Sequence, residues 1–422
     1  MTRIRKLKIK AGALQYVLFI GVVIVLLVFA FILLSYTQKQ FRLLNSQYIE
    51  SVKKTDALIV NLNENAVPDS QTMDPQLQET SVVSIKPWGL FQVAMATTGF
   101  RNQKFTKLAL IGGHAANRNS LYLQDNNQPL VVVGNTRIEG RISLPKQGIK
   151  RGSIAGNSYT GSELYYGYTQ PSTQQLPKFL GLDQLQQDIF AGPLNSTELS
   201  FDLAPDLELI NSFNEPTKAF RTEGLIELSN VKLTGNILIQ SSVGITLDAS
   251  SELADVLLIA PKVTIANNVK GNFQVLATDE IRVGSGCELN YPSALAIYQK
   301  PGVVEPSNQP ANQRSAALTI GTKSEIRGLV AFFSEQAQAP YETQVLLEDE
   351  STVVGEVYCR GNLELLGTVK GGVITEGFMA NQFGNLYKNH IYNGKILTSQ
   401  FPEQYVGLLL ETYQKKVAKW LY

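Results

Sequence analysis

Seven similar blocks decide the fold: IELSNVKLTGNILIQSSVG from Ile226, ITLDASSELADVLLIAPK from Ile245, VTIANNVKGNFQVLATDE from Val263, IRVGSGCELNYPSALAIYQK from Ile281, LTIGTKSEIRGLVAFF from Leu318, VLLEDESTVVGEVYCRGN from Val345 and LELLGTVKGGVITEGF from Leu363. Positions one and three of every block are Ile, Val or Leu, and the residue between them is polar in six of the seven blocks. Alternation with a period of two is typical of a half-buried β-strand. Each block therefore predicts a short strand at its start.

Two further apolar positions recur within each block. A single apolar residue lies six to eight positions after the start, and an apolar cluster follows near position twelve. Three inward-facing segments per 18-residue block describe one turn of a three-sided β-helix. We therefore expect a mainly β protein with a solenoid of about seven or eight such coils, centred on 224–378. An eight-stranded barrel or a sandwich is the alternative, but neither requires like residues to recur at one fixed period.

The region before the blocks, 81–223, is expected to be β-rich with an insertion. Residues 121–156 resemble the blocks in texture and predict an earlier coil, continued at Leu225 after an insertion over about 158–223. That insertion contains a predicted short helix, Leu182–Phe190. Residues 80–118 are β-like without a place in a coil.

The C-terminal region, 379–422, predicts a strand followed by a capping helix. From Pro402 onward, apolar residues follow the helical spacing i, i+3, i+4, i+7, namely Val406, Leu409, Leu410, Tyr413, Val417, Trp420 and Leu421. A solenoid end exposes unpaired strand edges, so we expect this helix to cover it. The alternative is docking of the helix on a partner, or on lipid through Lys415, Lys416 and Lys419.

The N-terminus predicts a membrane anchor. The basic tail, 1–12, has five basic and no acidic residues in its first ten positions, and 13–36 is uncharged and apolar. A helix of that length measures about 36 Å, enough to cross a hydrocarbon core of about 30 Å. The denser basic flank places the N-terminus in the cytoplasm. A cleaved signal peptide is the alternative, but its apolar region would be shorter and followed by a small-residue cleavage site.

Two segments separate this anchor from the body. Residues 37–65 predict a helical stalk, since Phe41, Leu44, Tyr48 and Val52 recur at helical spacing. Residues 66–80 are polar with prolines and predict a linker.

Composition excludes several functional classes. The chain has 37 basic and 36 acidic residues, and the part after the first ten positions carries a net charge of −4, which argues against nucleic-acid binding. Two cysteines and two histidines exclude a disulfide-rich scaffold and leave little for a zinc enzyme. Cys287 and Cys359 occupy different block positions and predict buried free thiols. His114 predicts a loop residue, and His390 has no partner in sequence.

No stretch carries a recognisable catalytic motif. The only dense acidic run, Glu348-Asp349-Glu350, falls at an expected turn, where solvated charge is the usual reason. A calcium-dependent lyase would need clustered acids and a basic residue for proton abstraction. We therefore expect a non-enzyme without catalytic residues, metal ligands or a cofactor.

The last blocks, STVVGEVYCRGNLELLGTVKGGVITEGF at 351–378, resemble the bactofilin type of polymer-forming bacterial β-helix, with its short G-x-V phrases. They are also similar to the β-helical ectodomains of pilus-assembly proteins that have an N-terminal membrane helix. The basic tail, Ala11-Gly12 and the long apolar helix resemble type IV pilin-like proteins, although Val17 stands where pilins carry a glutamate. The resemblance implies a structural or assembly role in the bacterial cell envelope.

These observations predict a single-pass protein of the bacterial inner membrane with a periplasmic body. It would be a scaffold of a pilus-like or secretion-like machine, with the membrane and other envelope proteins as partners and no nucleic acid. Self-association stays an open alternative. The inserts at 158–223 and 301–317 are the expected contact surfaces. The alternative function is a carbohydrate-binding or polysaccharide-lyase-like surface protein, suggested by the cluster of Tyr159, Tyr165, Tyr166 and Tyr168.

Overall fold

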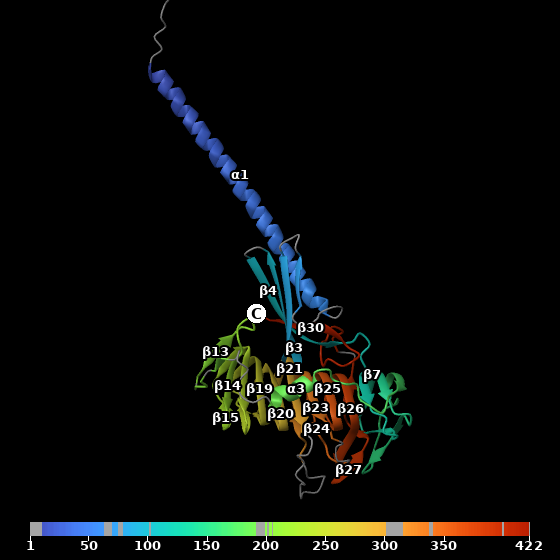
Figure 1. Ribbon diagram of the computed structural model, residues 1–422. Helices are drawn as coiled ribbons and strands as arrows, with labels where there is room; N and C mark the ends of the chain where they lie inside the picture. The colour runs from blue at the N-terminus through green and yellow to red at the C-terminus, as the bar shows by residue number, and fades with distance from the viewer. Residues whose placement is uncertain are drawn as a thin grey trace, which may run out of the picture.

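The computed structural model describes residues 11–62, 70–74, 79–100, 103–190, 199–200, 202–204, 206–300, 315–336, 341–398 and 401–421. The protein is mainly β, with 53% strand and 16% helix, as expected from the sequence. It has a long N-terminal helix, an antiparallel sheet beside the end of that helix, and a closed, parallel, barrel-like sheet below them (Figure 1).

The expected anchor and stalk form one continuous helix, α1 (Ala11–Val60), 50 residues long. Its N-terminal part reaches a mean hydropathy of 3.5 in its most apolar window and is exposed, which makes it long and apolar enough to span a membrane. The part after the uncharged stretch ends on the body, where Ile59 is buried. The stalk is therefore helical over 37–60, as expected, and residues 63–65 lie outside the described residues.

The antiparallel sheet has the strand order β1-β2-β3-β4-β30. Its strands are β1 (Ser70–Asp74), β2 (Glu79–Trp88), β3 (Phe91–Phe100), β4 (Gln103–His114) and β30 (Gln414–Leu421). Most of 80–118 is therefore β, as expected, up to His114, and belongs to a sheet separate from the parallel one. The expected linker, 66–80, is wrong over 70–74, since β1 pairs with β2 along its length; residues 66–69 and 75–78 lie outside the described residues.

The parallel sheet contains most of the remaining strands. They are β5 (Leu121–Leu123), β7 (Arg137–Leu144), β11 (Tyr166–Pro171), β12 (Leu199–Ser200), β13 (Glu208–Asn211), β14 (Lys218–Thr222), β15 (Leu225–Leu228), β16 (Lys232–Gly235), β17 (Ile237–Ser241), β18 (Gly244–Leu247), β19 (Glu252–Ile265), β20 (Lys270–Val283), β21 (Glu288–Gln299), β22 (Leu318–Ile320), β23 (Glu325–Ser334), β24 (Val345–Leu347), β25 (Thr352–Leu365), β26 (Thr368–Gln382) and β29 (Lys395–Leu397). Short strands β6 (Leu130–Val133), β8 (Ile149–Arg151) and β28 (His390–Tyr392) pair beside it, with the hairpin strands β9 (Ser153–Ile154), β10 (Asn157–Ser158) and β27 (Asn385–Lys388).

The register of this sheet confirms the alignment of the seven blocks. Their first residues pair in one parallel row, in the order Ile226, Ile245, Val263, Ile281, Leu318, Val345 and Leu363. The residues at positions one and three of every block are at most 3% exposed. The single apolar residue of each block is also buried. Six of these residues pair in a second row that runs from Leu233 to Val369, in which Gly271 takes the place of Val269. All these side chains belong to one apolar core.

The sheet extends beyond the blocks at both ends, which corrects two expectations. Residues 121–156 do not precede the first block: β5 pairs with β26 and β7 pairs with β29, at the C-terminal end of the row. The region 158–223 is not an excursion, because β13 pairs with β16 and β14 with β17 at the other end. Figure 1 shows β13–β15 and β7 at opposite ends, with β19–β26 between them. The expected helix is confirmed as α3 (Leu182–Phe190).

The expected C-terminal helix is wrong. Residues 401–413 form turns that bury Leu408, Leu409 and Leu410 against the parallel sheet, and β30 then pairs antiparallel with β4. The helical spacing of the apolar residues is accounted for by two different structures, a packed loop and an amphipathic strand. The far end of the block row is covered by 121–171 instead of a helix.

Candidate functional site

A groove of about 820 Å³ lies between the end of α1 and strand β30. The C-terminal turns 401–413 contribute to its wall. Its lining combines apolar, amide and basic side chains, namely Val60, Asn61, Gln404, Val406, Tyr413, Gln414, Lys415, Lys416, Val417 and Trp420. None of these lining residues carries a carboxylate, so the groove has a positive character.

Strand β30 forms an edge of the antiparallel sheet, next to β4. The N–H and C=O of Gly113 in β4 both bond to Gly407, on the side of β4 away from β30, at 2.8 Å each. In an antiparallel ladder, bonded and non-bonded pairs alternate. The pair Lys415–Gly113 is therefore a non-bonded pair, and so is Val417–Ile111, two residues along. The backbone N–H and C=O of Val417 consequently point away from β4, toward the groove side of the strand.

The three lysines of β30 do not act as one cluster, contrary to the lipid-docking alternative. Lys419 is bound to the parallel sheet, with its Nζ 2.7 Å from both carboxylate oxygens of Asp255. Lys415 and Lys416 line the groove. Burial lowers the pKa of Lys415. Of the two, Lys416 is the exposed one.

A buried ion pair holds the C-terminal turns on the parallel sheet. Nε of Arg118 lies 3.1 Å from Oε1 of Glu356 on β25, and both side chains are nearly inaccessible. The other carboxylate oxygen accepts a hydrogen bond from the N–H of Leu408 at 2.8 Å. The guanidinium also donates to the carbonyl of Tyr405 and lies over its ring. Burial raises the pKa of Glu356, and Arg118 opposes that rise. These contacts fix one wall of the groove.

The two histidines are structural. His114 is the last residue of β4 and is buried, so its assignment to a loop is wrong; its Nδ1 lies 3.0 Å from the carbonyl oxygen of Tyr405. His390 lies in β28, with Nδ1 2.7 Å from the carbonyl oxygen of Lys388, and burial lowers its pKa. Among the residues that the structure describes, no three His, Cys, Asp or Glu side chains are placed to hold a metal ion.

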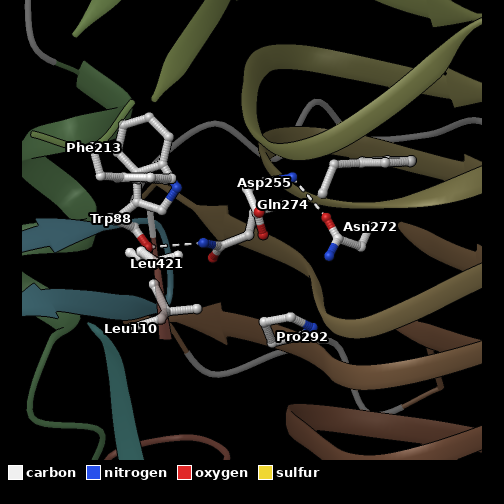
Figure 2. A pocket seen from close by; sticks show the side chains of 9 residues that line it. Trp88, Leu110, Phe213, Asp255, Asn272, Gln274, Pro292 and Leu421 are labelled. Atoms are coloured by element: carbon white, nitrogen blue, oxygen red, sulfur yellow. Dashed lines mark hydrogen bonds between the residues drawn. The ribbon is translucent and has the colours of Figure 1, made fainter. Parts of the chain in front are cut away.

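The two sheets are joined through Gln274 (Figure 2). Its side-chain oxygen accepts from the N–H of Leu90, and its amide donates to the carbonyl of Trp88, both at 2.9 Å. Gly89 between them has a φ of +63°, and a Cβ there would lie 2.2 Å from the glutamine oxygen. Phe213 packs edge-on against Trp88. The space enclosed is about 10 Å³, so this junction is a structural joint without room for a ligand.

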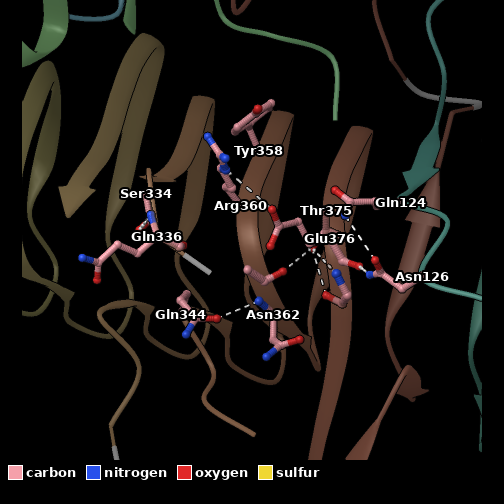
Figure 3. A network of polar contacts seen from close by, with 12 residues as sticks. Gln124, Asn126, Ser334, Gln336, Gln344, Tyr358, Arg360, Asn362, Thr375 and Glu376 are labelled. Atoms are coloured by element: carbon pink, nitrogen blue, oxygen red, sulfur yellow. Dashed lines mark hydrogen bonds and ion pairs between the residues drawn. The ribbon is translucent and has the colours of Figure 1, made fainter. Parts of the chain in front are cut away.

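A polar network joins the segment after β5, which contains Gln124 and Asn126, to β25 and β26 (Figure 3). The N–H of Asn362 donates to the side chain of Gln344 at 2.7 Å, and the Asn126 amide donates to the carbonyl of Glu376 at 2.7 Å. Arg360 lies 3.6 Å from the Glu376 carboxylate. These bonds satisfy polar groups at a corner of the sheet and hold the segment after β5 in place, which indicates a structural role.

An exposed arginine–tyrosine face lies on β7, β11 and the segments beside them. The guanidinium of Arg137 lies 4.4 Å from the ring centre of Tyr166, and that of Arg141 lies 5.2 Å from the ring of Tyr168. We use the name arginine–tyrosine face for Arg137, Arg141, Arg151, Tyr159, Tyr166 and Tyr168. Of the four tyrosines singled out in the sequence, Tyr165 stays outside this set. Tyr159 and Tyr165 both pack against the apolar core, and Tyr159 is included for its contact with Arg151.

Three other predicted features are the insert 301–317, the two cysteines and the acidic run. Residues 301–314 of the insert 301–317 lie outside the described residues. Cys287 and Cys359 are free and buried, as expected. The acidic run lies at the turn between β24 and β25, as expected, where Glu348 accepts from the N–H of Thr322 at 3.0 Å.

The groove and the buried ion pair were not predicted as sites. The tyrosines of the arginine–tyrosine face were singled out in the sequence, but its arginines were not. One signal was present: Glu356 pairs with Leu329 in the neighbouring strand, so a charged residue stands in an apolar position of the repeat. Nothing in the sequence placed Arg118 or β30 beside it. No protein-family model, curated protein or solved structure matches this chain.

Proposed function

We propose that this chain is a non-catalytic, membrane-anchored scaffold whose extracytoplasmic body binds an extended, acidic segment of an envelope protein. The observation that carries the proposal is the groove beside β30, set at the point where α1 meets the body. Because α1 is one continuous helix that ends at the groove, it would hold the groove at a fixed distance from the bilayer.

We propose further that the closed parallel sheet is wound as a three-sided β-helix. Two features support this reading. The long strands β19 and β20 pair with each other along three neighbouring stretches, and the paired first residues are 18 or 19 residues apart wherever no insert intervenes. A β-helix would give the body a stiff axis, because each turn is hydrogen-bonded to the next.

The anchor supports a single-pass location in a bacterial inner membrane, with the basic tail in the cytoplasm and the body in the periplasm. The uncharged stretch, 13–36, fits the membrane, and the helix continues over 37–60, which adds about 36 Å. The last turns of this stalk are held on the antiparallel sheet by a Thr55–Thr98 hydrogen bond and by an Asp56–Lys107 ion pair. The groove would therefore lie at a defined height above the bilayer.

The chemistry of the groove favours an acidic β-strand as its occupant. The backbone of Val417 points to the open side of β30, where a strand from a partner can add to the sheet. Lys416 is exposed and would attract carboxylates on one face of an added strand, and Val417 offers apolar contact on the other face, because successive residues of a strand point to opposite faces. A partner strand with alternating acidic and apolar residues meets both requirements.

The test is a binding measurement with the full-length protein in detergent. The probe is a fluorescently labelled hexapeptide of alternating Glu and Val, and its anisotropy reports binding. We expect binding to the parent protein, and at least a tenfold loss of affinity in K415E/K416E. The matched control is K262E/K323E, which makes the same charge change at exposed lysines of the parallel sheet and should bind as the parent does.

Two further peptides separate strand addition from simple charge attraction. A Lys–Val peptide should bind K415E/K416E in preference to the parent. An N-methylated Glu–Val peptide cannot donate along one edge and should bind weakly to every variant. Equal binding by both double variants, or full binding of the methylated peptide, would contradict the proposal.

A further inference from the structure

We propose that the arginine–tyrosine face binds acidic polysaccharide, with uronate sugars as the ligand class. This inference goes beyond the scaffold function and is independent of the groove. It rests on the geometry and charge of six side chains at one end of the parallel sheet.

The face is built on the outermost strand at that end. Strand β11 pairs with β7, and Tyr166 and Tyr168 lie beside Glu139 and Arg141 in register. Both tyrosines therefore project on the outward side of the sheet, two residues apart, about 6.6 Å along the strand. Their side chains are 37% and 54% exposed. The strand thus presents two aromatic rings in a row to solvent.

Each exposed tyrosine is held by an arginine. Arg137 lies over the ring of Tyr166 and is itself held by Glu139, at 2.6 Å from Nε. Arg141 lies near the ring of Tyr168, and its Nε donates to the phenol oxygen. Since an aromatic ring has two faces, a ring positioned by one cation still offers its other face. The rings are consequently oriented before any ligand arrives.

A third pair extends the face. Arg151 lies 6.0 Å from the ring centre of Tyr159 and donates to the carbonyl of Ser162 at 2.7 Å. Ser162 in turn lies 3.5 Å from the phenol oxygen of Tyr166. The three pairs therefore form one continuous surface instead of three separate contacts.

The local charge is positive while the rest of the body is not. Residues 137–168 contain five basic and two acidic residues, although the chain after its first ten positions carries −4 overall. A guanidinium binds a carboxylate through two parallel hydrogen bonds. A tyrosine ring packs against the apolar face of a sugar and keeps its hydroxyl in water. An acidic polysaccharide offers both groups at regular intervals.

Two other polyanions fit less well. A bilayer that holds the uncharged part of α1 lies beyond the stalk, whereas β7 lies below the last turns of α1, at the end of the parallel sheet opposite β13–β15 (Figure 1). A nucleic-acid surface is expected to belong to a strongly basic domain, and this body is weakly acidic. Lipid and DNA are therefore alternative outcomes of the test.

The experiment measures binding of polygalacturonate to the full-length protein by biolayer interferometry at low and moderate salt. We expect binding that weakens as salt rises, with at least a tenfold loss in R141Q/Y168A and near-parent binding in Y168F. The matched control is R327Q. Arg327 lies on a strand of the same sheet and contacts a glutamate two residues away at 2.6 Å, as Arg137 of the face does, so R327Q removes one arginine charge of the sheet outside the face. We expect R327Q to bind as the parent does.

Several results would overturn the proposal. These are no binding to polygalacturonate, equal binding by R141Q/Y168A and the parent, or a similar loss in R327Q. Binding of single-stranded DNA or of phosphatidylserine vesicles at equal strength would also reject it, because the surface would then be a general polyanion site. A melting temperature for each variant establishes that a loss of binding is not a loss of folding.

Discussion

The carboxyl group of Glu364 is buried although it occupies the polar slot between two strand residues of its block. It is 6% exposed, and its oxygen accepts from the N–H of Asn381 at 3.0 Å. The end of β26 and β27 form a hairpin that contains Asn381. This hairpin covers Glu364. Burial raises the pKa of Glu364 to about 7. The second position of a block, which is exposed at Glu227, Thr264 and Arg282, is thus covered at Glu364 by the later hairpin.

This burial predicts a pH-dependent penalty. In the unfolded chain a glutamate titrates near about 4.3. Between that value and about 7, the unfolded chain has released the proton that the folded protein still holds, so stability falls as pH rises through this window. Glu364→Gln stays neutral and keeps an acceptor oxygen. We expect it to be more stable than the parent by up to about 3 kcal/mol at pH 8, with no gain at pH 4. Urea unfolding at both pH values checks this.

The Arg118–Glu356 pair predicts a different pattern. Arg118→Met leaves a buried carboxylate without its cation, and removing one partner of such a pair costs about 3–5 kcal/mol. The double variant R118M/E356L removes both charges, and leucine matches Leu329 in the paired strand. We expect the double variant to be less destabilised than R118M in urea unfolding. Equal or larger destabilisation of the double variant would show that the ion pair itself stabilises the fold.

At the scale of single residues, the sequence predicted the core well and the buried charges poorly. Positions one and three of the blocks are apolar, and all are buried, because a period of two leaves only one side of a strand for the interior. Arg118 and Glu356 could not be paired from sequence, since the pairing of β5 with β26 and of β26 with β25 brings them together. The tyrosine cluster was visible, but its arginine partners lie on a neighbouring strand.

At the scale of elements, β30 is the main departure from expectation. The apolar residues of its segment fit a helix, yet β4 offers an edge with which a strand can pair. That edge needs partners for its N–H and C=O groups, and a strand satisfies them where a helix would not. Local spacing was therefore overridden by a sheet edge more than 290 residues away in sequence.

The strand pairing of β30 can be tested by cross-linking. Trp420 lies opposite Ala109 in β4, so the double variant A109C/W420C should form a disulfide on mild oxidation, seen by mass spectrometry of the digested protein. Both native cysteines are buried and should not compete. The control A109C/K416C pairs positions that are not opposite each other and should stay reduced. Oxidation of the control alone would place the C-terminus in another register.

At the scale of the whole molecule, the chain closes on itself in an order that the sequence did not reveal. The strands over 121–171 continue the sheet after the last blocks, and α3 leads the chain back to the other end. The periodicity predicted which residues pair within the row. The periodicity could not predict that 121–171 join the C-terminal end of the row, because the repeat pattern of a block is the same at either end.

The outermost strand predicts that this end does not stack on a second copy. Thr169 and Pro171 of β11 pair with the buried residues Ile142 and Leu144 of β7. The outermost strand thus has a polar residue and a proline, which lacks an N–H group, where the strand before it has aliphatic residues. Proline and polar residues on an edge discourage further pairing. We expect no end-to-end assembly of the parent by sedimentation velocity, and concentration-dependent association of T169I/P171L. Long polymers of the parent protein would contradict this prediction.

The most direct test of the scaffold proposal is the side of the membrane on which the body lies. Single cysteines at Arg5 and Lys416 are exposed to a membrane-impermeant maleimide in intact spheroplasts and again after lysis, and the native buried cysteines supply the background. We expect labelling of K416C before lysis and of R5C only after it. Labelling of R5C alone in intact spheroplasts, or of neither residue until lysis, would contradict a membrane-anchored extracytoplasmic scaffold.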